Sequence, residues 1–120
     1  MIAFAAPKDL ARIQEIWHAC FDDSVHFVDT YYRCRPADIQ TLVYREEDGV
    51  ISSMLEMVPC SLHAAGVQAK AFYIYAAATH PVYQGKRRMH RLIEAACALG
   101  KERGMAASML IPQNEGLVGF

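Results

Sequence analysis

Residues 71–104 read AFYIYAAATHPVYQGKRRMHRLIEAACALGKERG. The first nine, residues 71–79, are uncharged and rich in aromatic and apolar side chains, and they end before His80 and Pro81. Such a run predicts a buried strand. Further along, apolar residues recur at the spacing of one helix face, and these are Met89, Leu92, Ile93, Ala96, Cys97 and Gly100. The stretch therefore predicts a strand that turns sharply into a helix ending near Gly104.

A basic turn joins the predicted strand to the predicted helix. Four of the six residues from 86 to 91 are Lys or Arg. The first N–H groups of a helix have no intrahelical acceptor and attract anions, and cations gathered at this positive end repel one another unless an anion relieves them. The turn therefore predicts a phosphate site. A solvated basic corner is the alternative that composition alone leaves open.

The strand and the basic turn resemble the GNAT superfamily of acetyl-CoA-dependent N-acetyltransferases. The signature of that family is Gln or Arg, two variable residues, Gly, one variable residue, then Gly or Ala. Gln84 takes the first position, whereas Arg87 stands in place of Gly and Met89 in place of Gly or Ala. Gly tolerates a positive φ and has no side chain in the way of a phosphate. An Arg at that position could clash with a diphosphate or bind it with its guanidinium.

The resemblance implies one GNAT-like domain over residues 1–120. Its fold class would be α/β of the α+β type, with a mixed, mostly antiparallel central sheet and helices on both faces. Backbone groups of Ala77, Ala78 and Thr79 would pair with the pantetheine arm of acetyl-CoA as if it were another strand. The diphosphate would be held by the turn residues Gln84, Gly85, Lys86, Arg87, Arg88 and Met89. Close packing of strand against helix would explain the small side chains of residues 76–78 equally well.

Shorter patterns predict the elements that precede this unit. Residues 2–5 suit a first strand, and a helix face runs from Pro7 to Cys20. A second helical face contains Phe27, Val28, Tyr31 and Tyr32. In the family the matching region helps to form the acceptor pocket. The resemblance therefore implies acceptor contacts from Tyr31, Tyr32, Arg33 and Arg35.

The Asp48-Gly49 step between residues 41–44 and residues 50–58 predicts a hairpin whose second strand ends at Pro59. Residues 61–70 would be a loop or a second hairpin connection. Glu56 is then a carboxylate inside an otherwise apolar strand. If its face is buried, desolvation would strengthen it as a base. The alternative is an exposed residue on a half-solvated sheet.

Residues 105–111 predict another strand, and residues 112–117 resemble the Pro-x-Asn-x-x-Leu stretch that leads into a further helix in the family. The resemblance implies that Asn114 contacts the cofactor, and a helix-capping role is compatible with that contact. The helix and closing strands that the family supplies next are absent from these 120 residues. An apolar strand would then lie at a sheet edge. We therefore expect a homodimer through that edge, a swapped assembly or a weakly stable fragment.

The activity implied by the resemblance is direct transfer of an acetyl group from acetyl-CoA to a primary amine of a small molecule or peptide. The oxyanion donor would be the N–H of Ala77 or Ala78. Glu56 would be the base, directly or through water, and Tyr75 the acid for the departing thiolate. The alternative, suggested by Arg87 and Met89, is a degenerate and inactive module that binds coenzyme A or a protein partner.

Composition narrows the remaining classes. A net charge of −1 argues against nucleic acid as a main partner, and polyanion binding through the basic turn ranks last. Residues 1–6 do not resemble a secretory signal and no apolar run has the length of a membrane span, so we expect a cytoplasmic protein without a membrane partner. The scattered Cys20, Cys34, Cys60 and Cys97 predict reduced, mostly buried thiols and no metal site.

Overall fold

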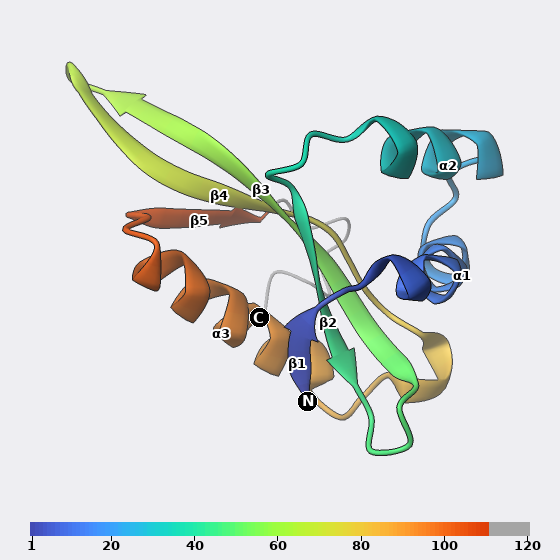
Figure 1. The fold of residues 1–120 in the computed structure, drawn as a ribbon. Coiled ribbons are helices and arrows are strands. Elements are labelled where there is room, and N and C mark those ends of the chain that lie inside the picture. The colour runs from blue at the N-terminus through green and yellow to red at the C-terminus, as the bar shows by residue number, and fades with distance from the viewer. Residues whose placement is uncertain (111–120) are drawn as a thin grey trace.

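The computed structural model describes residues 1–110, whose strands form one five-stranded sheet in the order β1-β2-β3-β4-β5. The strands are β1 (Ile2–Phe4), β2 (Gln40–Arg45), β3 (Ile51–Ala64), β4 (Val67–Thr79) and β5 (Ala107–Leu110). The first three neighbouring pairs are antiparallel, and β4 pairs with β5 in parallel. The predicted mixed, mostly antiparallel sheet is confirmed (Figure 1).

Helices cover both faces of this sheet (Figure 1). In the described residues they are α1 (Leu10–Cys20), α2 (Val25–Cys34) and α3 (Arg88–Glu102). On one face Trp17 of α1 packs with Met54 in a buried cluster that also includes α2. On the other face Leu92 of α3 packs with Phe72. Burial of these apolar helix faces holds the layers together, and the prediction of helices on both faces is confirmed.

The β3–β4 hairpin is longer than the sequence predicts. Pro59 does not end β3, which continues to Ala64, and β4 begins at Val67, so most of residues 61–70 are strand. The β2 pairing stops opposite Met57. Pro59 therefore lies where β3, within residues 1–110, has a neighbouring strand on one side only, a position in which a sheet tolerates Pro.

A bulge interrupts β4 near its C-terminal end. Two residues of β4, Ala76 and Ala77, lie opposite the single residue Leu55 of β3. Ala76 has a φ of 54°, a left-handed conformation that is uncommon for a residue with a Cβ. A bulge bends its strand and takes one residue out of the regular ladder. The alanine run of the sequence therefore coincides with a break in the pairing of β4.

The prediction of mostly buried thiols is wrong. All four cysteines are free, and Cys34 and Cys97 are exposed while Cys20 and Cys60 are partly buried. Cys97 lies at the margin of the apolar stripe of α3, whose buried centre includes Leu92 and Ala96. In the described part of the chain, no helix combines the length and the hydrophobicity that crossing a membrane requires.

Gly100 lies where α3 crosses β4. A Cβ at this position would lie 2.4 Å from a ring carbon of Phe72. Ala is more stable than Gly in an open helix by about 1 kcal/mol, whereas overpacking a core costs about 1–3 kcal/mol. We predict that Gly100→Ala lowers the free energy of unfolding, measured by urea denaturation, because Phe72 is buried and the clash outweighs the helix preference.

Phe72→Leu should restore part of the stability lost in Gly100→Ala, because a smaller side chain leaves room for the new methyl group. Gly104→Ala is the matched control, since Gly104 has a φ of 76° and no atom would lie within 4 Å of its Cβ. Phe72→Leu should not rescue that variant. A Gly100→Ala protein more stable than the wild type would contradict this packing.

Candidate functional site

The described part of β5 lies opposite residues 71–74 of β4. Within residues 1–110, no strand pairs with residues 75–79 on that side. Because the N–H of His80 donates to the carbonyl of Ser52 at 2.9 Å, the alternation of the ladder turns the backbone groups of Ala78 toward Met54 of β3. Ala77 lies at the bulge, where the ladder is interrupted. The carbonyl of Thr79 is already engaged, because it accepts from Gln84 Nε2 at 3.1 Å and from Cys20 Sγ at 3.2 Å.

The open edge leads into the turn before α3. Gly85 and Arg87 have positive φ values of 90° and 60°. None of the N–H groups of residues 85–90 donates a hydrogen bond to another group within residues 1–110. Unpaired N–H groups at a turn and a helix N-terminus create an anion-binding concavity. The predicted phosphate site thus has the required backbone donors.

Arg87 takes a left-handed backbone conformation, which Gly adopts freely. Its φ and ψ are 60° and 22°, and it caps the N-terminus of α3. Lys86 and Arg87 are both exposed and form no ion pair within the described residues. Their charges remain available to an anion.

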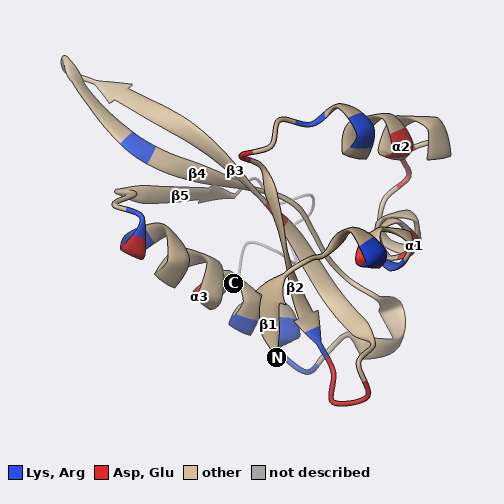
Figure 2. Cartoon of the chain, viewed as in Figure 1, with Lys and Arg blue, Asp and Glu red and all other residues tan. Residues whose placement is uncertain are grey.

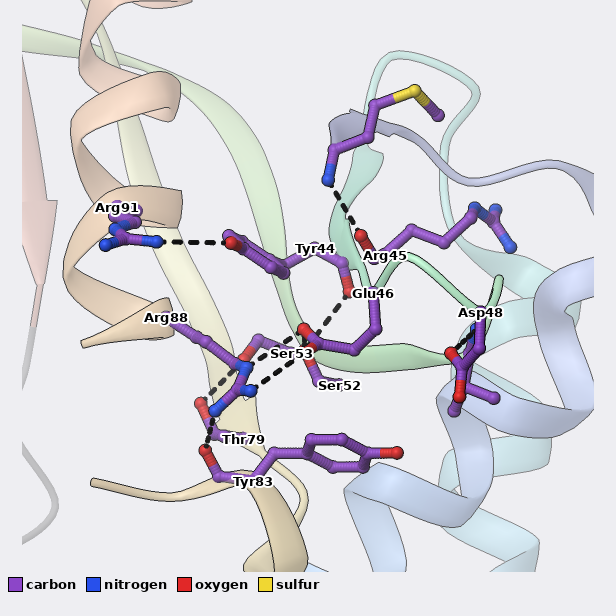
Figure 3. A network of polar contacts seen from close by, with 12 residues as sticks. Tyr44, Arg45, Glu46, Asp48, Ser52, Ser53, Thr79, Tyr83, Arg88 and Arg91 are labelled. Carbon is purple, nitrogen blue, oxygen red and sulfur yellow. Dashed lines mark hydrogen bonds and ion pairs between the residues drawn. The ribbon is translucent and has the colours of Figure 1, made fainter. Parts of the chain in front are cut away.

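Arg88 does not contribute its charge in the same way. Its guanidinium binds both carboxylate oxygens of Glu46, with Nε–Oε2 and Nη2–Oε1 distances of 2.9 and 2.8 Å. Its Nη1 donates to the carbonyl of Tyr83 at 2.7 Å (Figure 3). Figure 2 shows the acidic β2–β3 turn beside the basic turn that precedes α3. Glu46 therefore neutralises Arg88, which carries part of the positive charge that the sequence analysis expected a bound anion to neutralise.

Glu56 is fully buried, with 0% of its surface exposed, so the alternative of an exposed residue is wrong. Oε1 accepts from the Tyr31 hydroxyl at 3.0 Å and from the Arg35 guanidinium. Oε2 accepts from the Tyr32 hydroxyl at 3.3 Å and from the Thr41 hydroxyl. Four donors occupy the two oxygens, so the carboxylate makes no direct contact with an amine in this arrangement.

The predicted acceptor contacts divide into two groups. Tyr31, Tyr32 and Arg35 meet at Glu56, and burial, followed by the nearby Glu56 charge, raises the pKa of both tyrosines. Arg33 is exposed and pairs with Asp29 on the surface of α2. An open cavity of about 440 Å³ runs along α2, and its lining includes Phe27, Thr30, Tyr31, Arg35, Pro36 and Ile39.

Tyr75 lies immediately before the bulge, in a cluster of aromatic rings. Its ring centroid is 5.7 Å from that of Trp17, 5.6 Å from that of Tyr31 and 6.3 Å from that of Tyr73. Partial burial, together with the Asp23 carboxylate, raises the pKa of Tyr75. The hydroxyl therefore keeps its proton at neutral pH. The sequence pattern predicts Trp17 only as part of the buried face of the first helix. It does not indicate that Trp17 lies at the centre of this aromatic cluster.

Asn114, with the rest of residues 112–117, lies outside the described residues. Among residues 1–110, no group of three or more His, Cys, Asp or Glu side chains is arranged to hold a metal ion.

A sequence model of a protein family, described as an acetyltransferase (GNAT) domain, matches residues 2–119. The chain belongs to the GNAT acetyltransferase family. No curated protein matches its sequence. The match covers the open edge of β4, the basic turn and α3 in one continuous alignment. The resemblance inferred from residues 73–89 is therefore confirmed.

Solved GNAT-like structures share the fold at low sequence identity. A probable N-acyltransferase from Enterococcus faecalis V583 is 14% identical with a TM-score of 0.83, over 99% of this chain and 30% of that one. A GNAT acetyltransferase from Brucella melitensis, solved with acetyl-CoA, is 22% identical with a TM-score of 0.75, over 100% of this chain and 80% of that one. Glucosamine-6-phosphate N-acetyltransferase from Arabidopsis thaliana is 19% identical with a TM-score of 0.74, over 99% and 86%.

The left-handed backbone of Arg87 generates a stability prediction. A residue with a Cβ pays about 1–2 kcal/mol for this conformation, which Gly adopts freely. We predict that Arg87→Gly raises the free energy of unfolding in urea by about 0.5–1 kcal/mol, after the greater entropy of Gly in the unfolded chain is subtracted. Arg87→Ala keeps the strained conformation and should show no gain. Equal stabilities of the Gly and Ala variants would contradict the strain.

Proposed function

We propose that this chain transfers an acetyl group from acetyl-CoA directly to a primary amine. The observation that supports this most is the order of two features along the chain. The edge of β4 that has no partner strand within residues 1–110 comes first, and the N–H-rich turn before α3 follows it. Acetyl-CoA joins an extended pantetheine arm to a diphosphate, so one molecule suits both features. The Brucella melitensis structure with acetyl-CoA supports the same cofactor class.

In the proposed complex, the backbone of Ala77 at the bulge pairs with the pantetheine arm, whereas the backbone groups of Ala78 face β3. The N–H groups of residues 85–90 hold the diphosphate, and the exposed Lys86 and Arg87 add charge-assisted hydrogen bonds. Gln84 acts indirectly, because its side chain closes the turn onto the carbonyl of Thr79. Asn114 remains a proposed contact from the family pattern.

The thioester supplies the acetyl group, and the chain supplies positioning, hydrogen bonds and protons. The N–H of Ala77 donates to the carbonyl oxygen as negative charge develops. Tyr75 carries the proton that the departing sulfur takes. Because both oxygens of Glu56 are occupied, the acceptor ammonium gives its proton to the Tyr31 hydroxyl oxygen while the Tyr31 proton passes to Oε1 of Glu56. The amine acceptor, a small molecule or a peptide, would enter along α2.

A degenerate module that binds coenzyme A or a protein without turnover is the second candidate. The observation that favours it is the full occupation of Glu56 by four protein donors, which leaves no carboxylate free to receive the proton. This candidate differs from the first in catalysis and not in fold. Measurement of turnover separates the two.

We further propose that residues 1–120 act as a single domain in the cytoplasm and associate as a homodimer through the outer edge of β5. The sheet shared by all described strands supports one domain, and the position of β5 at the end of the strand order supports association. Light scattering coupled to gel filtration measures the molecular mass. A purely monomeric mass at high protein concentration would refute the proposed dimer.

Acetyl-CoA should stabilise the folded protein against heat. A ligand present at 100 times its Kd adds about 2.7 kcal/mol to the free energy of unfolding, so we predict a clear rise in Tm with acetyl-CoA and a smaller one with coenzyme A. Inorganic phosphate at the same concentration is the control and should have little effect. A phosphate response equal to that of acetyl-CoA would indicate a general anion site and refute the cofactor assignment.

Tyr75→Phe should lower kcat with any accepted amine by about 100-fold, the scale of general acid catalysis, with little change in acetyl-CoA binding. Tyr73→Phe is the matched control because its ring stacks on Tyr75 and has no assigned proton. A folded Glu56→Gln variant should also lose kcat if the indirect base role holds. Full kcat in either Tyr75→Phe or Glu56→Gln would remove the role of that residue.

A further inference from the structure

The Glu46–Arg88 ion pair joins two parts of the chain that meet only in the folded state. Glu46 follows β2, and Arg88 begins α3. The pair is bidentate, and the side chains of Glu46 and Arg88 are 19% and 14% exposed. The Arg88 guanidinium also lies over the Tyr83 ring, 5.1 Å from its centroid. Arg88 is therefore held in one orientation by a carboxylate, a carbonyl and an aromatic face (Figure 3).

Glu46 is itself fixed on a tight turn. Its N–H donates to the carbonyl of Val50 at 2.8 Å, and its carbonyl accepts from the N–H of Gly49 at 2.9 Å. Its carboxylate accepts from Ser52 Oγ at 2.8 Å, and Ser52 is fully buried. Hydrogen bonds from Arg88 hold the pKa of Glu46 below its usual range. The carboxylate is therefore an ionised and rigid anchor.

The contacts of Arg88 span the proposed diphosphate turn. The carbonyl of Tyr83 lies on the N-terminal side of residues 84–87, and the backbone of Arg88 lies on the C-terminal side. Because one side chain holds the carbonyl of Tyr83 from within the first turn of α3, it fixes the distance between the two ends of the turn. Within residues 1–110, no hydrogen bond from the N–H groups of residues 85–90 holds the turn from inside.

We infer that Glu46 is a positioning residue for the diphosphate site, acting through Arg88 to hold the turn in the conformation whose N–H groups converge. The inference rests on the proposed function for its ligand. Glu46 would not touch acetyl-CoA. Arg88 would then hold the turn in shape and would not make the direct phosphate contact that a basic turn suggests.

The sign of one measurement separates this role from a simple charge effect. Glu46 is a negative charge near an anion site. If charge alone mattered, Glu46→Gln would remove repulsion, free Arg88 for the phosphates and tighten acetyl-CoA binding. If Glu46 positions the turn, the same substitution weakens binding, because the N–H groups no longer converge.

The experiment compares acetyl-CoA with S-acetylpantetheine, which has the same thioester arm and no diphosphate. We expect Glu46→Gln to raise the Kd for acetyl-CoA about tenfold while the Kd for S-acetylpantetheine stays within about twofold of the wild-type value. In the double variant with Arg88→Met, the two losses should not add, since both changes break one contact. An acetyl-CoA Kd that is unchanged or lower in Glu46→Gln would overturn the inference.

Asp9→Asn is the matched control for lost stability. Asp9 also forms a partly buried ion pair, with Arg45 at 2.9 Å, and within residues 1–110 its carboxylate has no hydrogen bond or ion pair to the basic turn. It should leave both Kd values unchanged, and a tenfold loss in this variant would refute a specific role for Glu46. If Glu46→Gln does not fold, Ser52→Ala removes one hydrogen bond from the carboxylate and is judged by the same criteria, with a smaller expected loss.

Hydrogen exchange in the free protein gives a readout that does not depend on the proposed function. The amides of Gln84 and Arg91 flank the turn and donate to the carbonyls of Pro81 and Arg87, so they should exchange faster in Glu46→Gln than in Asp9→Asn. If the wild type binds no acetyl-CoA, the proposed function fails and this comparison still decides the positioning role. Equal exchange in the two variants would overturn it.

Discussion

Within residues 1–110, backbone hydrogen-bonding groups without partners are the constraint around which this structure is organised. The described part of β5 pairs with β4 as far as Ile74, and the donors of the turn before α3 have no acceptor within residues 1–110. Such groups must find water or a ligand. The two sets lie in sequence along one continuous path of the chain. The rest of the molecule keeps that path open and in place.

The helices on the two faces of the sheet are held in place by different interactions. On the α3 face, close apolar packing brings the helix onto Phe72, and Gly100 allows the approach. On the opposite face, a buried carboxylate takes part. Removing Glu56 from water is costly and is offset by Arg35 and three hydroxyl donors. Two of those hydroxyls come from Tyr31 and Tyr32 of α2, so the network ties this short helix to the sheet.

Local patterns in the sequence were enough to predict the strand–turn–helix unit, the β2–β3 hairpin and the family. They were enough to single out Glu56, because a charge in an apolar strand is visible in one window of residues. They did not indicate that Glu46 neutralises Arg88, since 42 residues separate the two and only the folded sheet brings them together. Nor did they indicate the positive φ of Ala76, which no residue preference signals. The continuation of β3 through Pro59 was missed because Pro usually ends a strand and the open edge beside it is a tertiary feature.

Along the β3–β4 hairpin, the number of neighbouring strands decreases toward the tip. Near Met57 the ribbon lies between other strands, whereas from Leu62 to its tip each strand pairs only with its twin within residues 1–110. Two strands alone have little stability in water. Fraying therefore begins at the Ala65 and Gly66 turn and moves inward until it meets the broader sheet, where it stops. The distal ribbon is a small cooperative unit of its own, able to open and close while the broader sheet stays folded.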